Sequence, residues 1–399
     1  MKKLVKVSMV GVFVSLFTFM IWSPALAEVG VTDTKIKVGS HTALTGPVAF
    51  AGKFLNEGMR VYYQAINDAG GIHGRKVEYI AEDNAYKPAR AVAATKKLLD
   101  RDQVFIMQGV LGAPMFKAIE PILTENKVPF LFPMAAITDI VHPVKRYVFS
   151  YTAIYDRIFT VQVDTAVKQL KAKKISLFYP DNAVGQDFRA IVIKRLKKYG
   201  LTPLESVPVK HTDVDFSGVV AKLKASGTDT VMNANHIPVT VAFLKECRRQ
   251  NFNPTFFQDP SATDPLIFGL AKDPAVTNGI MGATYVWPND SDAEPVKKWR
   301  ATMKKYSTMK LSNYTQMAYA QCVMTVDAMK QVGRNLTRER LIDQLETWQG
   351  YNNGLSGPIN FSPTDHEGQE SFFIVRANNN KWEFAFDKRI SVEEKLVRD

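Results

Sequence analysis

The chain has 399 residues, of which 46% are hydrophobic and 23% charged, and its formal net charge is +12. This length and composition exclude a disordered or fibrous protein and favour two globular domains. Cys247 and Cys322 are the only cysteines, which excludes a disulfide-rich scaffold.

The first 27 residues have the pattern of a signal peptide. Three lysines precede an almost uncharged apolar run over 7–22, and residues 25–27 (Ala-Leu-Ala) put small side chains where a signal peptidase reads them. The apolar run is shorter than the roughly 20 residues that a membrane-spanning helix needs. We therefore expect cleavage after Ala27, no lipid anchor because no cysteine lies nearby, and a mature protein in the periplasm.

The expected compartment also decides how to interpret the charge and the cysteines. Removal of residues 1–27 lowers the basic residues from 51 to 48, against 39 acidic ones, which leaves a net charge of +9. A basic balance can indicate nucleic-acid binding, but the lysines are dispersed and secretion removes that partner. An exported protein can form a disulfide between Cys247 and Cys322, and two separate buried thiols are the open alternative.

From residue 35, short apolar runs alternate with helical patterns. Strands are expected at 36–41, 77–81, 104–107 and 129–132. Apolar residues at helical spacing from Leu55 to Ile66 predict a helix that ends at Gly70, and further helices are expected to begin at Pro88 and Pro114. Continuous apolar strands that alternate with helices indicate a parallel sheet covered on both faces.

The alternation restarts after residue 147. Helices are expected at 156–171, 184–199, 216–226 and 238–250, and strands at 175–179, 206–209, 230–233 and 279–284. Three helices then follow at 292–306, 313–332 and 337–345, and strands at 359–361, 371–376 and 382–386 with a turn at 378–380. The fold class is therefore α/β with two lobes, and a cleft is expected where the carboxyl ends of their strands face each other.

No pattern of catalytic or metal-binding residues stands out. The six histidines are scattered without an HExxH motif, and no CxxC motif occurs. Residues 46–53 resemble a phosphate-binding loop, but the second glycine is one position late and Phe54 replaces the Ser or Thr that holds magnesium. We therefore expect a protein that is not an enzyme and that carries no metal or cofactor.

Three stretches in the first lobe carry a resemblance to a known family. They are 36–39 (Ile-Lys-Val-Gly), 44–49 (Leu-Thr-Gly-Pro-Val-Ala) and 66–77 (Ile-Asn-Asp-Ala-Gly-Gly-Ile-His-Gly-Arg-Lys-Val). In this order, behind a signal peptide, they resemble the leucine/isoleucine/valine-binding family of periplasmic solute-binding proteins of ABC transporters. Weaker similarity continues at 109–114, 133–136, 215–217 and 357–361.

This resemblance implies a type I periplasmic binding fold. In that fold, two Rossmann-like lobes are joined by three crossings and close over the ligand by hinge motion. The crossings are expected near 149–152, 283–285 and 354–358. The N-terminal lobe then comprises residues 28–149 plus 284–355, and the C-terminal lobe comprises residues 150–283 plus 356–390.

The loop before Pro114 is the strongest candidate for a ligand contact. Strand 104–107 leads through this loop into a helix that begins with proline, and the unpaired N–H groups of a helix N-terminus bind anions. The glycines of the loop have the alternative role of shaping a turn. The resemblance makes this the first ligand loop and 133–136 the second, which implies ligand contacts from Leu111, Gly112, Ala113, Met134, Ala135 and Ala136.

Both loops depart from the family where an amino acid is held. The family has a serine in the first loop and a threonine in the second, and here Ala113 and Ala136 stand in their places. The acid that meets the ligand's ammonium group corresponds to Asp259, or to Pro260 in an alternative alignment. These departures imply a small carboxylate ligand with an apolar or aromatic body, bound in preference to a branched-chain amino acid.

Four further residues complete the expected ligand site with Asp259 and the two loops. Tyr155 and Tyr285 lie beside expected crossings, where an aromatic side chain either lines the cleft or packs within the hinge. His236 stands where the family has an aromatic residue, and Asn235 precedes it. The alternative for His236 is an ordinary surface histidine.

The leading hypothesis is a monomeric solute-binding protein that passes a small carboxylate ligand to the membrane permease of an ABC importer. It has no nucleic-acid partner. One alternative is a ligand-sensing module for a membrane receptor, which would use the same closed form. The other alternative is binding of a branched-chain amino acid.

Overall fold

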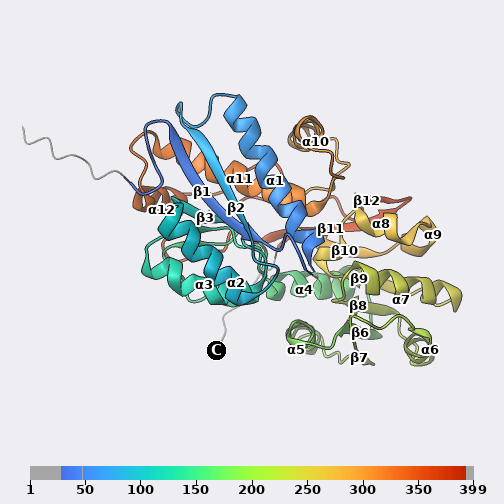
Figure 1. Cartoon of the computed structure of the whole chain (residues 1–399). Helices are drawn as coiled ribbons and strands as arrows, with labels where there is room; N and C mark the ends of the chain where they lie inside the picture. The colour runs from blue at the N-terminus through green and yellow to red at the C-terminus, as the bar shows by residue number, and fades with distance from the viewer. Residues whose placement is uncertain (1–27, 47, 392–399) are drawn as a thin grey trace, which may run out of the picture.

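The computed structural model describes residues 28–46 and 48–391 and shows two α/β lobes (Figure 1). Each lobe has its own β-sheet, and the two lobes lie one above the other in the figure. The two-lobed α/β fold predicted from the sequence is therefore confirmed. The predicted signal peptide, residues 1–27, lies outside the described residues.

The sheet of the first lobe is entirely parallel, in the order β2-β1-β3-β4-β5. Val38 pairs with Ile106 across the two central strands, and both side chains are fully buried. Helices on both faces of such a sheet exclude water, which explains the continuous apolar runs in its strands. The strands are β1 (Lys35–Thr42), β2 (Lys76–Asp83), β3 (Ile106–Gln108), β4 (Phe130–Leu131) and β5 (Val148–Phe149).

The helices of this lobe come from two distant parts of the chain. They are α1 (Ala49–Asp68), α2 (Pro88–Lys96), α3 (Ala113–Glu125), α10 (Glu294–Tyr306), α11 (Asn313–Val332) and α12 (Arg338–Glu346). The helix α11 packs along α1 so closely that only glycine fits at position 58, where a Cβ atom would lie 2.4 Å from the carbonyl oxygen of Thr315. This packing holds the late helices on the first lobe.

The sheet of the second lobe is mixed, in the order β12-β11-β10-β9-β8-β6-β7, with β13 also paired to β11. Its strands from β6 to β10 run parallel, and β11 is antiparallel to β10, β12 and β13. The β11–β12 hairpin turns at Asn379 and Asn380, which both have positive φ as this tight turn requires. The strands are β6 (Ile175–Pro180), β7 (Ser206–Val209), β8 (Thr230–Asn233), β9 (Thr255–Gln258), β10 (Met281–Thr284), β11 (Ser371–Asn378), β12 (Lys381–Phe384) and β13 (Ile390–Ser391).

The helices of the second lobe mostly begin with recognisable N-terminal signals. Pro238 lies in the first turn of α7, and the Asn182 side chain accepts a hydrogen bond from the Gly185 N–H at the start of α5. The helix α4 continues into a π-helical turn, Thr165–Gln169. The helices are α4 (Tyr155–Asp164), α5 (Ala183–Lys197), α6 (Ser217–Ala225), α7 (Ile237–Arg249), α8 (Leu266–Ala271) and α9 (Pro274–Thr277).

Several details differ from the sequence-based expectations, and one open question is answered. Residues 359–361 form no strand, because only Ile359 pairs, through isolated bridges to Tyr351 and Gln369. The strands β5, β9 and β13 and the short helices α8 and α9 were not anticipated. Cys247 and Cys322 are buried and unpaired on α7 and α11, in different lobes, so the alternative of two separate thiols holds.

The chain passes between the sheets three times: after β5, after β10, and between α12 and β11. The predicted lobes, 28–149 plus 284–355 and 150–283 plus 356–390, place their limits at the end of β5, inside β10 and between α12 and β11, and these limits stay a prediction.

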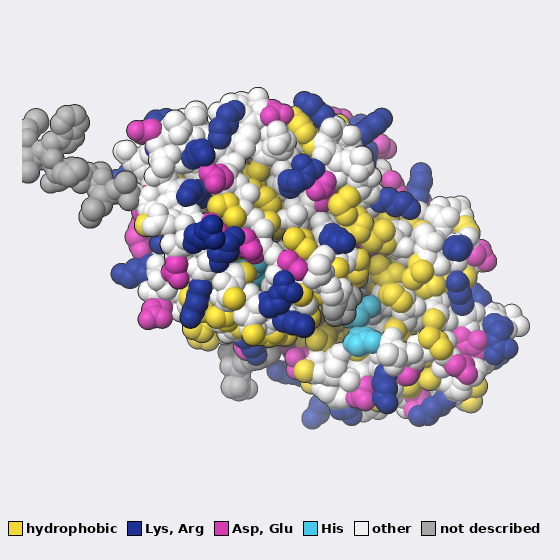
Figure 2. Space-filling model, in the orientation of Figure 1, with side chains coloured by type: hydrophobic (Ala, Val, Ile, Leu, Met, Phe, Trp, Pro, Cys, Tyr) yellow, Lys and Arg dark blue, Asp and Glu magenta, His cyan; other side chains and the backbone are white. Residues whose placement is uncertain are grey.

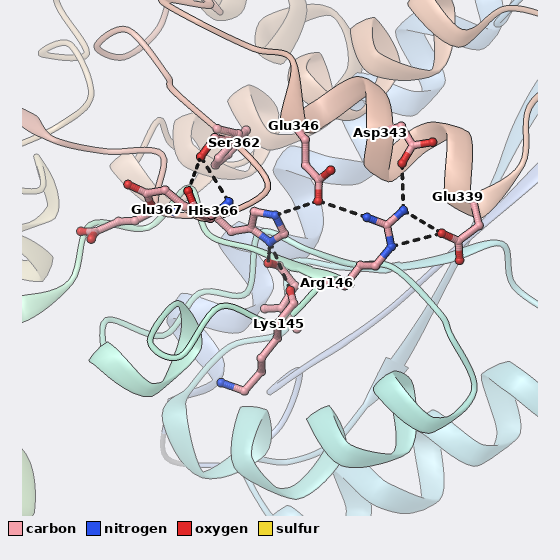
Figure 3. A network of polar contacts seen from close by, with 12 residues as sticks. Lys145, Arg146, Glu339, Asp343, Glu346, Ser362, His366 and Glu367 are labelled. Atoms are coloured by element: carbon pink, nitrogen blue, oxygen red, sulfur yellow. Dashed lines mark hydrogen bonds and ion pairs between the residues drawn. The ribbon is translucent and has the colours of Figure 1, made fainter.

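A network of charged side chains ties the last connection to the first lobe (Figure 3). Arg146, just before β5, contacts Glu339 at 2.9 Å, Asp343 at 2.8 Å and Glu346 at 3.3 Å, all on α12. Glu346 also lies 3.3 Å from Nε2 of His366, whose Nδ1 lies 2.8 Å from a carbonyl oxygen of β5. The residues before β11 are thereby fixed against both α12 and β5.

A buried ion pair then joins this segment to the second lobe. The guanidinium of Arg157, on α4, donates to both carboxylate oxygens of Glu367 at 2.5 and 2.9 Å. The exposed fractions of the two side chains are 6% and 0%. A bidentate pair of this kind has a defined geometry. Each charge depends on the other for electrostatic compensation, because both side chains are almost fully buried and water cannot solvate them.

We predict that Arg157→Met destabilises the protein strongly, because it leaves the buried Glu367 carboxylate without its guanidinium partner, with only the His142 imidazole beside it at 3.6 Å. Loss of one partner of a buried pair costs about 3–5 kcal/mol. The double variant Arg157→Met/Glu367→Leu should recover most of this loss, measured as the free energy of unfolding in urea. The control is Glu294→Gln at the exposed pair with Lys297, which should change stability by less than about 1 kcal/mol. If Arg157→Met alone lowers the free energy of unfolding no more than this control does, the prediction is wrong.

Candidate functional site

The candidate site lies where loops at the carboxyl ends of parallel strands meet. The loop after β3 and the loop after β4 are joined by a bridge at Leu111 and Met134. In this bridge the Gly112 N–H donates to the Met134 carbonyl oxygen at 3.0 Å, and the Met134 N–H donates to that of Val110 at 2.8 Å. In the second lobe, Asp259 follows β9 and Tyr285 follows β10. This is the edge at which open α/β sheets bind ligands.

These loops enclose a cavity of about 130 Å³ whose lining residues come from both lobes. The first lobe contributes the two ligand loops and the start of α11, whereas the second contributes α4 and the residues after β9. In the space-filling view, hydrophobic side chains gather where the upper and lower-right parts of the surface meet, and histidine side chains lie beside them (Figure 2). A ligand held here would touch both lobes at once.

Tyrosines form much of the polar lining of the cavity. The Tyr285 hydroxyl donates to the Met317 sulfur at 3.2 Å, and its ring packs edge-on against Tyr151 at 5.3 Å between centroids. Burial raises the pKa of Tyr155, Tyr285 and Tyr314 above the usual tyrosine value, so all three hydroxyls stay protonated. They offer hydrogen-bond donors and apolar ring faces to a ligand.

Asp259 is the only charged residue among the described residues that line the cavity. It is 3% exposed, and its Oδ1 accepts a hydrogen bond from the Ser261 N–H at 2.8 Å. Burial raises the pKa of this carboxyl to about 6. The nearby Asp264 differs, because it accepts hydrogen bonds from the Ser312 hydroxyl and from the N–H groups of Asn313 and Leu266, and thereby anchors α11.

The first ligand loop requires glycine at position 112. Gly112 has a φ of 101°, and a Cβ atom there would lie 2.6 Å from the Tyr86 ring and 2.7 Å from the Met115 side chain. Glycine therefore shapes the turn that leads into α3, as the alternative interpretation held. Neither Gly112 nor Ala113 lines the cavity, although Leu111 does.

The structure brings together six of the eleven predicted ligand contacts, namely Leu111, Met134, Ala136, Tyr155, Asp259 and Tyr285. Gly112, Ala113 and Ala135 lie in the ligand loops but outside the cavity lining. Asn235 is buried, with its side-chain amide donating to Asn233. His236 is exposed at the N-cap of α7 and stacks on His211 at 5.1 Å between centroids. A role in ligand binding stays a prediction for all eleven residues.

The cavity also contains residues that the sequence did not single out. They are Thr152, Ala153, Ile158, Pro260, Ser261, Asn313, Tyr314 and Met317. The last three belong to α11, which is distant in sequence from both ligand loops, and no local pattern there marks a site. Thr152, Ala153 and Ile158 are close to Tyr155 in the sequence, so the prediction of Tyr155 as a ligand contact could have been extended to them.

A match to a protein-family model identifies the family of this chain. A family model described as "Periplasmic binding protein" matches residues 35–381, which is most of the chain. The chain belongs to the periplasmic binding protein family. Its two parallel-sheet lobes agree with that assignment.

Among curated relatives, the "Leu/Ile/Val-binding protein homolog 3" of Brucella melitensis is 29% identical over 49% of this chain and 53% of its own length, so the match spans about half of that relative. A branched-chain amino acid transporter structure from Thermus thermophilus with bound valine superposes with a TM-score of 0.82 at 16% identity, covering 91% and 98% of the two chains. A fatty acid ABC transporter substrate-binding protein from Thermomonospora curvata has a TM-score of 0.79 at 24% identity, covering 92% and 95%.

Within residues 28–46 and 48–391, no three His, Cys, Asp or Glu side chains gather as metal ligands. No helix in the same part of the chain is long and apolar enough to cross a membrane.

We predict that Asp259→Asn stabilises the ligand-free protein at pH 7.5. The folded-state pKa of about 6 exceeds the ordinary aspartate value of 3.8, so the ionised carboxylate opposes folding, and this penalty declines as the pH falls below about 6. At 1.36 kcal/mol per pKa unit, the gain at pH 7.5 has an upper bound of about 3 kcal/mol and should vanish below about pH 4.

Urea unfolding at several pH values measures this difference. Asn can still accept the Ser261 N–H, so the cap is kept. The control is Asp273→Asn, another aspartate that caps a helix but is exposed. The prediction fails when Asp259→Asn leaves the pH dependence of stability the same as in the unmodified protein.

Proposed function

We propose that this chain is the extracytoplasmic solute-binding protein of an ABC importer, without catalytic activity. The observation that carries the proposal is the cavity between the lobes, because a ligand that contacts both lobes stabilises their closed arrangement. A permease can recognise that arrangement as the loaded form. Two solved structures with this fold are of proteins named as parts of ABC transporters, which supports the same class of function.

The proposed ligand is a small carboxylate with an apolar or aromatic body, preferred over a branched-chain amino acid. Ala136 in the cavity and Ala113 beside it offer no hydroxyl to the α-carboxylate or ammonium group of an amino acid. Leu111, Met134, Ile158 and the tyrosine faces suit an apolar body. The Thermomonospora protein named for fatty acids supports this class of ligand, since its fold is the same.

The position of Asp259 favours a second candidate, a branched-chain amino acid. A buried carboxylate with a single hydrogen bond can accept further bonds from a ligand ammonium group. A short acid held entirely within this cavity would instead need Asp259 in its protonated form, which donates a hydrogen bond to the ligand carboxylate. The two candidates therefore require opposite protonation states of the same side chain, and pH distinguishes them.

We predict that 4-methylpentanoate and phenylacetate bind more tightly than leucine, and that lowering the pH from 7.5 to 5.5 strengthens acid binding. With a pKa of about 6, Asp259 becomes mostly protonated over this interval, and the affinity for the acids should rise roughly tenfold. The affinity for leucine should fall, because its ammonium group needs the ionised form. Isothermal titration calorimetry at both pH values measures these changes.

Asp259→Asn is the matched variant for this titration. It should remove the pH dependence for the acids and abolish leucine binding, whereas Asp273→Asn should leave both unchanged. Tighter binding of leucine than of either acid, with affinity lost at low pH, would establish the amino acid as the ligand class. Conversion of a bound acid during the titration would disprove the non-enzymatic proposal.

We also predict that the exported protein begins at Glu28, since Ala27 ends the proposed signal peptide. N-terminal sequencing of protein recovered from the periplasmic fraction of an expressing bacterium checks this. Retention of Met1, or recovery only from the cytosol, would contradict the proposed location. Ala27→Leu, which replaces the small residue at the cleavage position, should leave the uncleaved form membrane-bound.

A further inference from the structure

A second hollow, of about 410 Å³, adjoins the ligand cavity. The two spaces share Ala136 and Tyr155 as lining residues. The Tyr155 N–H donates to the Ala136 carbonyl oxygen at 2.9 Å, so this common wall is fixed by a backbone hydrogen bond between the second ligand loop and α4. We call the first space the inner cavity and the second the outer compartment.

The outer compartment is also built from both lobes. Lys117 on α3 lies on its first-lobe side, and Asp187, Ile191 and Lys194 on α5 lie on its second-lobe side. Any change in the angle between the lobes therefore alters both spaces together. A ligand that occupied both would hold the closed arrangement through more contacts than one confined to the inner cavity.

Size favours use of both spaces. Small-molecule sites usually have volumes of roughly 300–1,000 Å³. The inner cavity, at about 130 Å³, falls below this range, whereas the outer compartment alone lies within it. Of the two residues at the shared wall, Ala136 presents only a methyl group, which obstructs a passing ligand less than a larger side chain would, and Tyr155 presents its ring.

The two spaces differ in the charged side chains that line them. The inner cavity has one charged side chain, Asp259, which repels a carboxylate when it is ionised. The outer compartment is lined by two lysines and by three carboxylates, namely Lys117, Lys194, Asp139, Asp156 and Asp187. Asp156 accepts a hydrogen bond from the Thr138 hydroxyl at 2.8 Å. Lys117 pairs with Asp139 at 2.9 Å, but Lys194, on the exposed face of α5, makes no ion pair within the described part of the chain. Lys194 is therefore the cation available to an anionic ligand.

We propose that the ligand is an elongated carboxylate that lies across both spaces, with its apolar or aromatic end in the inner cavity and its carboxylate beside Lys194 in the outer compartment. This inference rests on the proposed function and specifies its ligand class. It places the carboxylate away from Asp259 and accounts for the absence of hydroxyls at the inner loops. A single short acid or amino acid fills only one of the two spaces.

The test is a titration series with a constant aromatic head, consisting of phenylacetate, 4-phenylbutanoate and 6-phenylhexanoate. Affinity should rise along the series as the carboxylate reaches α5. Lys194→Met should weaken 6-phenylhexanoate roughly threefold to tenfold, as expected for an ion pair open to solvent, and should leave phenylacetate and the uncharged 6-phenylhexanamide unchanged.

The matched control is Lys197→Met, which removes the same charge from an exposed position of α5 outside the lining of the outer compartment. Equal effects of the two variants, or no effect of Lys194→Met on the longest acid, would overturn the extended orientation. If phenylacetate binds as tightly as the longer acids, the proposed extended orientation is wrong, but the proposal that the ligand is a carboxylate still holds. If leucine binds and no acid does, the proposed ligand class fails as well.

Discussion

The whole architecture depends on one constraint: two sheets must present the carboxyl ends of their parallel strands to each other. Three connections between the lobes maintain this arrangement. The buried pair of Arg157 and Glu367 and the Arg146 network fix the last connection against α4, α12 and β5 (Figure 3). Loops that follow β3, β4, β9 and β10 can then meet in one cavity, although they are far apart in the chain.

The cavity and the core that supports it differ in how closely their atoms pack and how fully their carboxylates are hydrogen-bonded. Around it, helices α1 and α11 approach so closely that Gly58 is needed, and Asp264 is fully hydrogen-bonded to the start of α11. Inside it, Asp259 is buried with a single hydrogen bond and a raised pKa. A binding protein benefits from this contrast, because the polar groups left unsatisfied in the empty state are the ones that a ligand can satisfy.

Much of the fold could be predicted because its signals are local. Continuous apolar strands, helix-starting prolines and the stop at Gly70 placed most elements within a few residues, and β7, β8 and α11 matched the expected limits. The strand expected at 359–361 was wrong, because an apolar-polar-apolar alternation of only three residues (Ile-Asn-Phe) looks the same in a bridge as in a strand. The site was harder, since Tyr314 and Met317 reach the cavity only through the packing of α11 on α1, and no residue pattern records that packing.

The central claim is that a small ligand binds, unchanged, between the two lobes. The most direct measurement is a crystal structure of the protein with the molecule that copurifies with it, identified by mass spectrometry. The account predicts a molecule in contact with Tyr155, Tyr285 and Asp259, with its apolar part among the tyrosines and both lobes touching it. A molecule bound elsewhere on the surface, or found as substrate and product together, would contradict the account.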